Sequence, residues 1–217
     1  MINIDKYDFF IFDCDGVILD SNKLKSNAFA EALPEEPPDL VADFVEYHKE
    51  NGGISRYQKF RYYFEGMRKQ VEAEEKIEKA LNNFSLIVSQ GLISCNYIPG
   101  ALEFIENLFK LNKRMFVVSG SDENELIQVF IKRSIDHYFE KIYGSPANKA
   151  ENTGKVVSNM KKPLIGLFFG DSKSDYDAAN FFGIDFVFVK DYSEWENGLE
   201  IVDHKNTINS FEKILLT

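Results

Sequence analysis

Cysteine, histidine and tryptophan are scarce in this 217-residue sequence, which has two, three and one of them. Two cysteines are too few for a disulfide framework or a cysteine-rich metal site. The histidines are scattered along the chain, which disfavours a histidine-based metal centre. A reducing, cytoplasmic compartment is the simplest interpretation.

The sequence also lacks a long apolar run and an excess of positive charge. No stretch reaches the ~18 uncharged apolar residues of a membrane helix. Residues 1–8 are polar and acidic, so we expect neither a membrane span nor a secretory leader. The net charge of −10 disfavours general binding to nucleic acid or anionic membrane. An anionic substrate would therefore need a local cation or backbone N–H groups.

What the sequence does have is a change of pattern near residue 96. Residues 17–95 contain no convincing strand. Their patterns predict four helices, over 22–33, 41–50, 55–67 and 72–93. Beyond them strands alternate with helices. The expected strands are 114–121, 141–145, 164–171 and 185–190, and the expected helices are about 101–111, 122–134, 149–161, 175–183 and 206–216.

This alternation predicts an α/β fold built on a doubly wound, Rossmann-like parallel sheet. The buried strand at 7–12 is expected to join that sheet. The prediction is therefore a catalytic core of residues 1–16 and 96–217, with an all-helical cap over 17–95 inserted after the first strand.

Polar residues and glycines stand where four predicted strands end, and parallel strands end at one edge of a sheet. The residues are Asp13, Asp15, Ser119, Gly120, Lys149, Asp171 and Asp175. This set suits phosphoryl transfer. One Asp can attack phosphorus, and a second acid can move the proton. Carboxylates can hold Mg²⁺, and a hydroxyl, backbone N–H groups and a lysine can hold phosphate oxygens.

Four stretches in this order resemble the haloacid dehalogenase superfamily, and most of all its phosphoglycolate phosphatase and β-phosphoglucomutase branch. They are DCDGVILDS at 13–21, the strand ending in Ser119, GSPANK at 144–149 and GDSKSDYDAA at 170–179. The likeness covers the whole chain and includes PGALEFIENL at 99–108. Residues 17–95 correspond to the mobile cap of that family.

The resemblance implies roles for the acids. Asp13 corresponds to the nucleophile. Asp15 corresponds to the general acid and base, with its backbone carbonyl on Mg²⁺. Asp171 corresponds to a Mg²⁺ ligand, and Asp175 to a ligand or an orienter of metal-bound water. Superfamily members that cleave carbon–halogen bonds lack the second Asp, so Asp15 favours phosphate chemistry.

The same resemblance assigns phosphate binding to Ser119, Gly120 and Lys149. Lys155 also lies in the third motif, but it would sit almost two turns down the helix, so Lys149 is favoured. Asp177 is two positions past Asp175 and would point to another helix face, toward solvent.

Two residues of the first motif are given structural roles. Cys14 should point away from Asp13 and Asp15 and pack as an inert thiol, although a redox role stays open. Asp20 is expected to cap or brace the first cap helix.

The segment NGGISRYQKFRYYFEG at 51–66 is basic and aromatic in an otherwise acidic chain. In one interpretation its aromatics build the cap's core and its cations are solvated. In the other, the Gly-Gly loop faces the site, and Arg56 or Lys59 holds an anionic or sugar group of the substrate.

These observations predict a Mg²⁺-dependent phosphatase, a phosphoric monoester hydrolase, acting on a small phosphorylated metabolite through an aspartyl phosphate. The alternatives are a sugar-phosphate phosphomutase, a receiver-like signalling domain and a catalytically idle binding protein. Sugar phosphate, phosphoglycolate and nucleotide all remain possible substrates, and the chain is expected to be a monomer or a homodimer.

Overall fold

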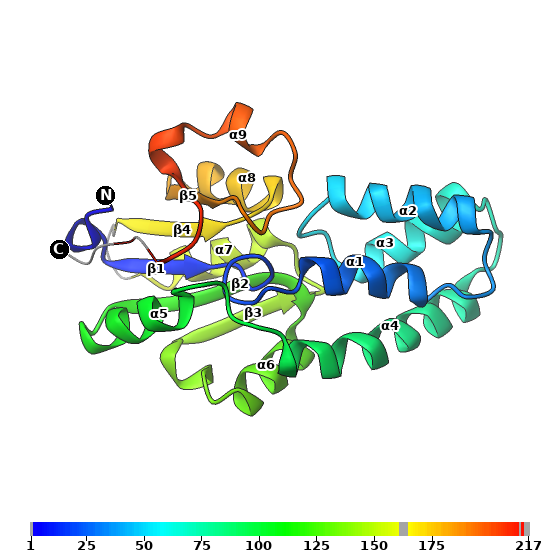
Figure 1. Ribbon diagram of the computed structural model, residues 1–217, viewed down its shortest axis with the longest axis horizontal. Helices are drawn as coiled ribbons and strands as arrows, with labels where there is room; N and C mark the ends of the chain where they lie inside the picture. Colours follow the sequence, from blue (N-terminus) through cyan, green and yellow to red (C-terminus); the bar gives the residue numbers. More distant parts are fainter. Residues whose placement is uncertain (1, 161–164, 213, 215–217) are drawn as a thin grey trace.

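A six-stranded parallel sheet forms one end of the molecule (Figure 1). The computed structural model describes residues 2–160, 165–212 and 214. The sheet order is β3-β2-β1-β4-β5-β6. The strands are β1 (Phe9–Phe12), β2 (Arg114–Asp122), β3 (Lys141–Ser145), β4 (Gly166–Gly170), β5 (Asp185–Val189) and β6 (Thr207–Ile208). The strand order reverses between β1 and β4, which is where such sheets bind ligands.

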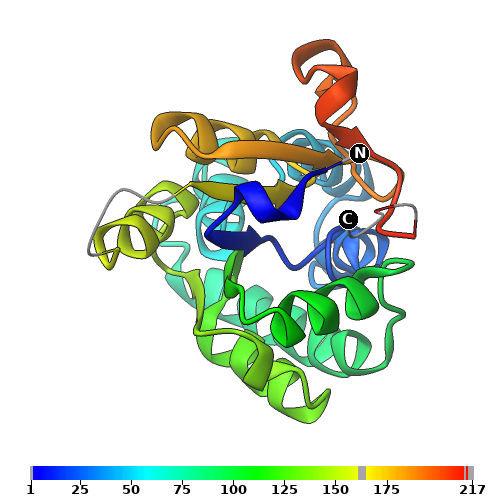
Figure 2. The same ribbon diagram turned by 90° about the vertical axis from the view of Figure 1, so that its left-hand side faces the viewer.

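Helices cover both faces of this sheet (Figure 2). Phe10 and Phe12 of β1 pack in the same core as α5 and α6. Phe9 and Ile11 belong to the core on the other face, with α7 and α8. The helices of this part are α5 (Ala101–Lys110), α6 (Glu123–Lys132), α7 (Lys149–Ser158), α8 (Lys173–Phe181) and the short α9 (Gly198–Ile201). The predicted doubly wound α/β sheet is confirmed.

The other end of the molecule is helical and lies beyond the carboxyl ends of the strands (Figure 1). Its elements are α1 (Asn22–Glu31), α2 (Pro38–Glu50), α3 (Arg56–Arg61), the π-helical turn η2 (Tyr62–Met67) and α4 (Glu74–Ser94). We propose this unit as the cap.

Aromatic side chains fill the centre of the helical end. Phe60 and Tyr63, from the basic and aromatic segment, are buried against Phe29, Phe44 and Phe84. The aromatics of the segment therefore build the interior of this unit, as the first interpretation expected, but its expectation of solvated cations is wrong for Arg56 and Lys59, which are buried. The predicted single helix over 55–67 changes to a π-helical turn at Tyr62.

The helix predicted at the C-terminal end is wrong for the described residues. Thr207 and Ile208 form β6 beside β5, and residues 209–212 are not helical. The β-branched pair extends the sheet, and Phe211 packs into the core beside Phe104 and Phe169. Other parts of the predicted elements, at 161, 164, 213, 215 and 216, lie outside the described residues. The sequence patterns also missed α9.

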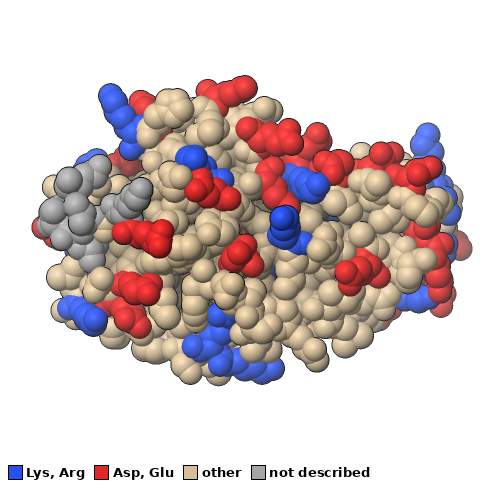
Figure 3. Space-filling view, viewed as in Figure 1, with Lys and Arg blue, Asp and Glu red and all other residues tan. Residues whose placement is uncertain are grey.

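None of the described helices combines the length and apolar content needed to cross a lipid bilayer. On the face drawn in Figure 3, acidic and basic side chains are interspersed over both the sheet end and the helical end.

Candidate active site

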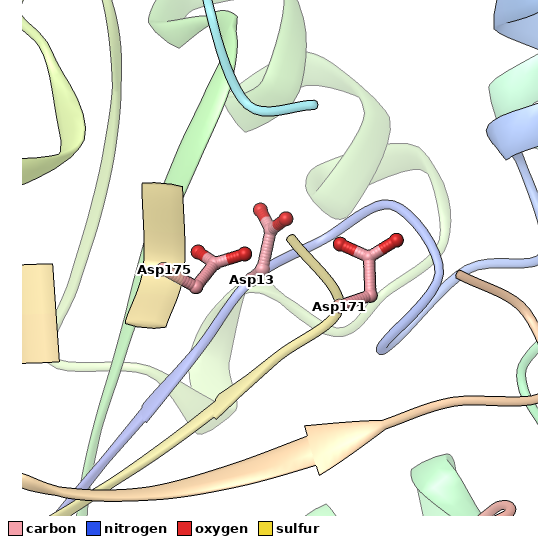
Figure 4. A group of neighbouring side chains, drawn as sticks. All are labelled: Asp13, Asp171 and Asp175. Atoms are coloured by element: carbon pink, nitrogen blue, oxygen red, sulfur yellow. The ribbon is translucent and has the colours of Figure 1, made fainter. Parts of the chain in front are cut away.

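Three carboxylates meet at the switch point of the sheet (Figure 4). Asp13 follows β1, Asp171 follows β4, and Asp175 lies in the first turn of α8. Each offers an oxygen within 4.8 Å of the other two, and all three residues are buried. The sequence-based convergence of strand ends thus accounts for their meeting.

Burial and mutual repulsion make it unfavourable for all three of these carboxylates, the acidic triad, to be ionised together. Burial and the carboxylates of Asp175 and Asp15 raise the pKa of Asp13 to about 7, although Lys149 opposes the rise. Burial, with Asp13 and Asp175, also raises the pKa of Asp171 well above its usual range. A divalent cation would remove this excess negative charge, and oxygen donors of this kind suit Mg²⁺. The residues therefore fit the metal that the sequence led us to expect.

Lys149 links two members of the acidic triad. Its buried ammonium donates to Asp13 Oδ2 at 2.7 Å and to Asp175 Oδ1 at 2.6 Å. Burial lowers the pKa of Lys149, but the two carboxylates outweigh burial and raise it, so the lysine keeps its charge. It begins α7, where Asn148 forms a capping box with Glu151 and holds the helix start in place.

Asp15 lies in a separate environment from Asp13. Its carboxylate accepts hydrogen bonds from Lys25 Nζ, Ser21 Oγ and Ser121 Oγ. Burial alone would raise the pKa of Asp15, but Lys25 and these donors lower it. Two carboxylates one residue apart therefore differ in pKa because they have different partners.

Ser119 and Gly120 lie at the carboxyl end of β2. The buried Ser119 hydroxyl donates to Ser121 Oγ and accepts from Ser121 N–H, each at 3.2 Å. A Cβ on Gly120 would lie 2.3 Å from the carbonyl oxygen of Gly53, so only glycine lets the helical end approach this closely.

The loop between α2 and α3 rests on the site. Ser174 Oγ donates to the Gly52 carbonyl at 3.0 Å, and Gly53 lies against Lys149. The Gly-Gly loop therefore faces the site, as the second interpretation of residues 51–66 expected.

Two contacts attach α3 to the start of α6. Both terminal nitrogens of Arg56 lie 2.7 Å from Glu125 carboxylate oxygens, and Tyr57 donates to Asp122 at 2.8 Å. Asp122 caps α6 by accepting from Glu125 N–H, while the Glu125 carboxylate is held by Arg56 rather than closing a capping box. The terminal nitrogens of Arg56 are thus already paired with the core. Its role in gripping a substrate stays a prediction.

Other sequence-based expectations have mixed outcomes. Lys155 donates to Asn152 Oδ1, away from the acids, and Asp177 is exposed and paired with Lys173, as predicted for both. Cys14 is fully buried in the hydrophobic core. The prediction that Asp20 caps α1 is wrong: the chain turns so that Ser21 is the N-cap, and Asp20 is exposed.

The cavity above the acids includes residues that the sequence analysis missed. They are Asn22, Lys25, His48, Ser121 and Glu194. Asn22 donates to Asp171 Oδ2 at 2.6 Å. Ser21 and Lys25 are four apart at the start of α1, and this helical spacing beside the first motif could have pointed to their shared partner, Asp15.

The sequence matches the family model of haloacid dehalogenase-like hydrolases over residues 10–189, which is most of the chain. This chain belongs to that family. No curated protein matches it significantly.

Similar solved structures cover nearly the same length. One is a predicted phosphoglycolate phosphatase from Haemophilus somnus, with 18% identity, a TM-score of 0.74 and 95% of each chain covered. A haloacid dehalogenase-like family hydrolase from Streptococcus pneumoniae has 20% identity, a TM-score of 0.61 and 85% of each chain covered. Protein tyrosine kinase A from Mycobacterium tuberculosis has 19% identity, a TM-score of 0.61, and 98% of this chain and 93% of its own covered.

These likenesses show the fold of this haloacid dehalogenase-like hydrolase. The names of the similar structures include a phosphatase and a kinase, so the activity has to be argued from the side chains of the site.

Proposed function

We propose that this hydrolase is a Mg²⁺-dependent phosphatase that cleaves a small phosphorylated metabolite through a phosphoryl group on Asp13. The observation that supports it is the division of labour between neighbouring carboxylates. Asp13 is held by Lys149 within the acidic triad, whereas Asp15, which lines the same cavity, is held by three donors.

In the first step an oxygen of Asp13 attacks phosphorus, and the bond from phosphorus to the leaving oxygen breaks. Lys149 holds the attacking carboxylate and offsets the charge that gathers on the phosphoryl oxygens. Ser119 and the backbone N–H groups after it are suited to hold those oxygens, because they stand at the same strand edge.

Asp15 acts as the general acid and then as the general base. It gives a proton to the leaving oxygen, then takes one from the water that attacks phosphorus and releases Asp13. In the substrate-free protein, Lys25 and the hydroxyl donors lower the pKa of Asp15 and keep its carboxylate deprotonated, which is the form that can take a proton from water. The arriving phosphoryl group is negatively charged, and this charge would raise the pKa of Asp15 for the first step.

Mg²⁺ would be held by Asp13 and Asp171, with Asp175 and the Asp15 backbone carbonyl as further candidates. When bound, it supplies positive charge that neutralises the carboxylates and the phosphoryl oxygens.

Asp171→Asn keeps an acceptor for Asn22 but removes one charge. We expect it to abolish any rise in melting temperature that Mg²⁺ gives the wild type. An unchanged rise would contradict the assignment.

The decisive experiment is a phosphate-release screen over phosphorylated metabolites with Mg²⁺, using Asp13→Asn as the blank. Release by the wild type alone supports the proposal, whereas equal release by both proteins, or release by neither, contradicts it. A phosphomutase would return isomerised sugar phosphate instead of free phosphate. The receiver-like alternative is disfavoured by the inserted helical unit, and a long-lived phosphorylated protein would revive it.

A further inference from the structure

A second polar cluster faces the catalytic acids across the cavity. We call it the upper cluster: His48 from α2, Lys59 from α3, and Glu194 from the loop after β5. All three line the same cavity as Asp13 and Asp15. The steps proposed above use none of them, so their arrangement needs another explanation.

The upper cluster is built as a unit. Lys59 is 1% exposed, and its Nζ lies 2.6 Å from His48 Nδ1 and 3.2 Å from the His48 carbonyl oxygen. The imidazole packs against the Phe29 ring, with the ring centroids 4.3 Å apart. Glu194 is held by Ser26 Oγ, which lies 2.8 and 2.9 Å from its two oxygens.

One atom of this unit is left over. His48 Nε2 is buried and has no hydrogen-bond partner among the described residues. It lies 3.9 Å from Glu194 Oε2, which is too far for a direct hydrogen bond. An unpaired buried polar atom costs free energy, so a site that keeps one is suited to receive a partner.

The groups around the imidazole bear on which of its ring nitrogens carries a hydrogen. When Lys59 is protonated, Nδ1 accepts from its ammonium, and the hydrogen of the neutral ring is then on Nε2, facing the Glu194 carboxylate. Burial and the positive charges of Lys59 and Lys25 lower the pKa of His48 to about 2, which keeps the ring neutral. The gap between His48 and Glu194 thus presents one donor, Nε2–H, and one acceptor, Oε2.

A hydroxyl group is the partner that fits a donor and an acceptor together. Its oxygen can accept from His48 Nε2–H while its hydrogen is donated to Glu194 Oε2. A carboxylate or second phosphate fits poorly, because it would face Glu194. The other cations that line the cavity already have carboxylate partners: Arg56 pairs with Glu125, Lys25 with Asp15, Lys49 with Glu46 and Lys173 with Asp177.

The remaining walls of the cavity suit a hydroxylated carbon skeleton. Phe29, Phe84, Val88, Leu92 and Trp195 line it with apolar surface. Such surface packs against the C–H faces of a polyol or sugar, while the upper cluster reads its hydroxyls.

We propose that His48 and Glu194 determine specificity by bridging a hydroxyl of the leaving group, so that the substrate is a phosphorylated polyol or sugar. This inference rests on the proposed phosphatase activity. It excludes phosphoglycolate as the preferred substrate, because that leaving group carries a carboxylate.

A panel of phosphate esters with and without hydroxyl groups tests the inference, and glycerol 3-phosphate and propyl phosphate share a three-carbon skeleton. The panel contains glycerol 3-phosphate, erythrose 4-phosphate and glucose 6-phosphate, with propyl phosphate and phosphoglycolate as the compounds lacking a neutral hydroxylated leaving group. We expect at least one hydroxylated compound to exceed propyl phosphate and phosphoglycolate about tenfold or more in kcat/KM. A site that hydrogen-bonds a hydroxyl rejects analogues lacking it.

Variants of the upper cluster then assign the preference to residues. Glu194→Gln and His48→Asn should reduce the ratio of kcat/KM values for hydroxylated over propyl phosphate about tenfold, mainly through KM. Asn can still accept from Lys59 but does not reach the position of Nε2. His48→Gln can place a donor there and should recover part of the ratio. Glu196→Gln, on the same loop and exposed, is the matched control and should leave the ratio unchanged.

The outcomes separate the two proposals. If the wild type releases phosphate from propyl phosphate as readily as from every hydroxylated compound, or prefers phosphoglycolate, the inference is overturned while the phosphatase proposal stands. An unaltered ratio in folded Glu194→Gln and His48→Asn, judged by their melting temperatures, also overturns it. If the wild type releases phosphate neither from this panel nor from any other phosphorylated metabolite, the phosphatase proposal itself is overturned.

Discussion

The two sides of the cavity treat their polar side chains differently. On the sheet side, Lys149 contacts two carboxylates and Asp15 accepts from three donors. On the helical side, His48 Nε2 has no hydrogen-bond partner among the described residues, and the hydrogen-bond contacts of Lys59 Nζ within them are an imidazole and a carbonyl, with no carboxylate. The groups assigned to the chemistry are thus held in place by protein partners, whereas the groups assigned to recognition keep a buried nitrogen that a ligand can bond.

The largest effect should come from the sheet side. Asp13→Asn removes the attacking oxygen, so we expect kcat to fall at least about 1,000-fold. Phosphate release under saturating substrate measures it. Asp177→Asn, an exposed acid on α8, is the control and should stay close to wild type. Comparable activity in the two variants would contradict the assignment of Asp13.

Lys149 should come next. Lys149→Met leaves Asp13 and Asp175 without their shared cation, and we expect kcat to fall about 100-fold. Lys155→Met, in the same helix but bonded to Asn152, should change kcat little. If the Lys155 variant loses more activity than the Lys149 variant, the choice between the two lysines is wrong.

The contact between the two sides should have an intermediate effect. Arg56→Ala and Glu125→Gln each break the pair that joins α3 to α6, so we expect each to lower kcat/KM about tenfold. The double variant should be no worse than either single one, because both lose the same contact. If Arg56 instead grips the substrate, Arg56→Ala alone will raise KM.

The last prediction concerns the stability of the helical side, with no change in activity expected near neutral pH. Burial lowers the pKa of Lys59 from 10.5 to about 7. Between these values the unfolded chain binds more protons, so this group makes the wild type more stable as pH rises from about 7 to 10.5. The slope is at most about 1.4 kcal/mol per pH unit.

Lys59→Met should lack this contribution, and denaturant unfolding at several pH values measures it. Lys132→Met, at an exposed position on α6, is the control. Parallel stability curves for the wild type and the Lys59 variant would show that Lys59 is not the buried, proton-losing group described here.

The prediction of the sheet succeeded because short apolar stretches alternating with helices have few other arrangements. Asp13, Asp171 and Lys149 could be grouped for the same reason, since each stands directly after a strand or at the start of a helix. Their catalytic roles stay predictions. The prediction failed at residues 207–212, where β6 and Phe211 are positioned by pairing with β5 and by aromatic packing. Local patterns contain neither contact.

The sequence by itself determined that Asp13, Asp171 and Asp175 would meet, because the carboxyl ends of parallel strands share one edge. Only the tertiary structure decided that Asp15 would be held by Lys25 and Ser121, and that His48 would face Glu194. These contacts join residues far apart in sequence, on helices and loops whose relative positions depend on how the helical unit packs against the sheet. No periodicity or spacing along the chain records that packing.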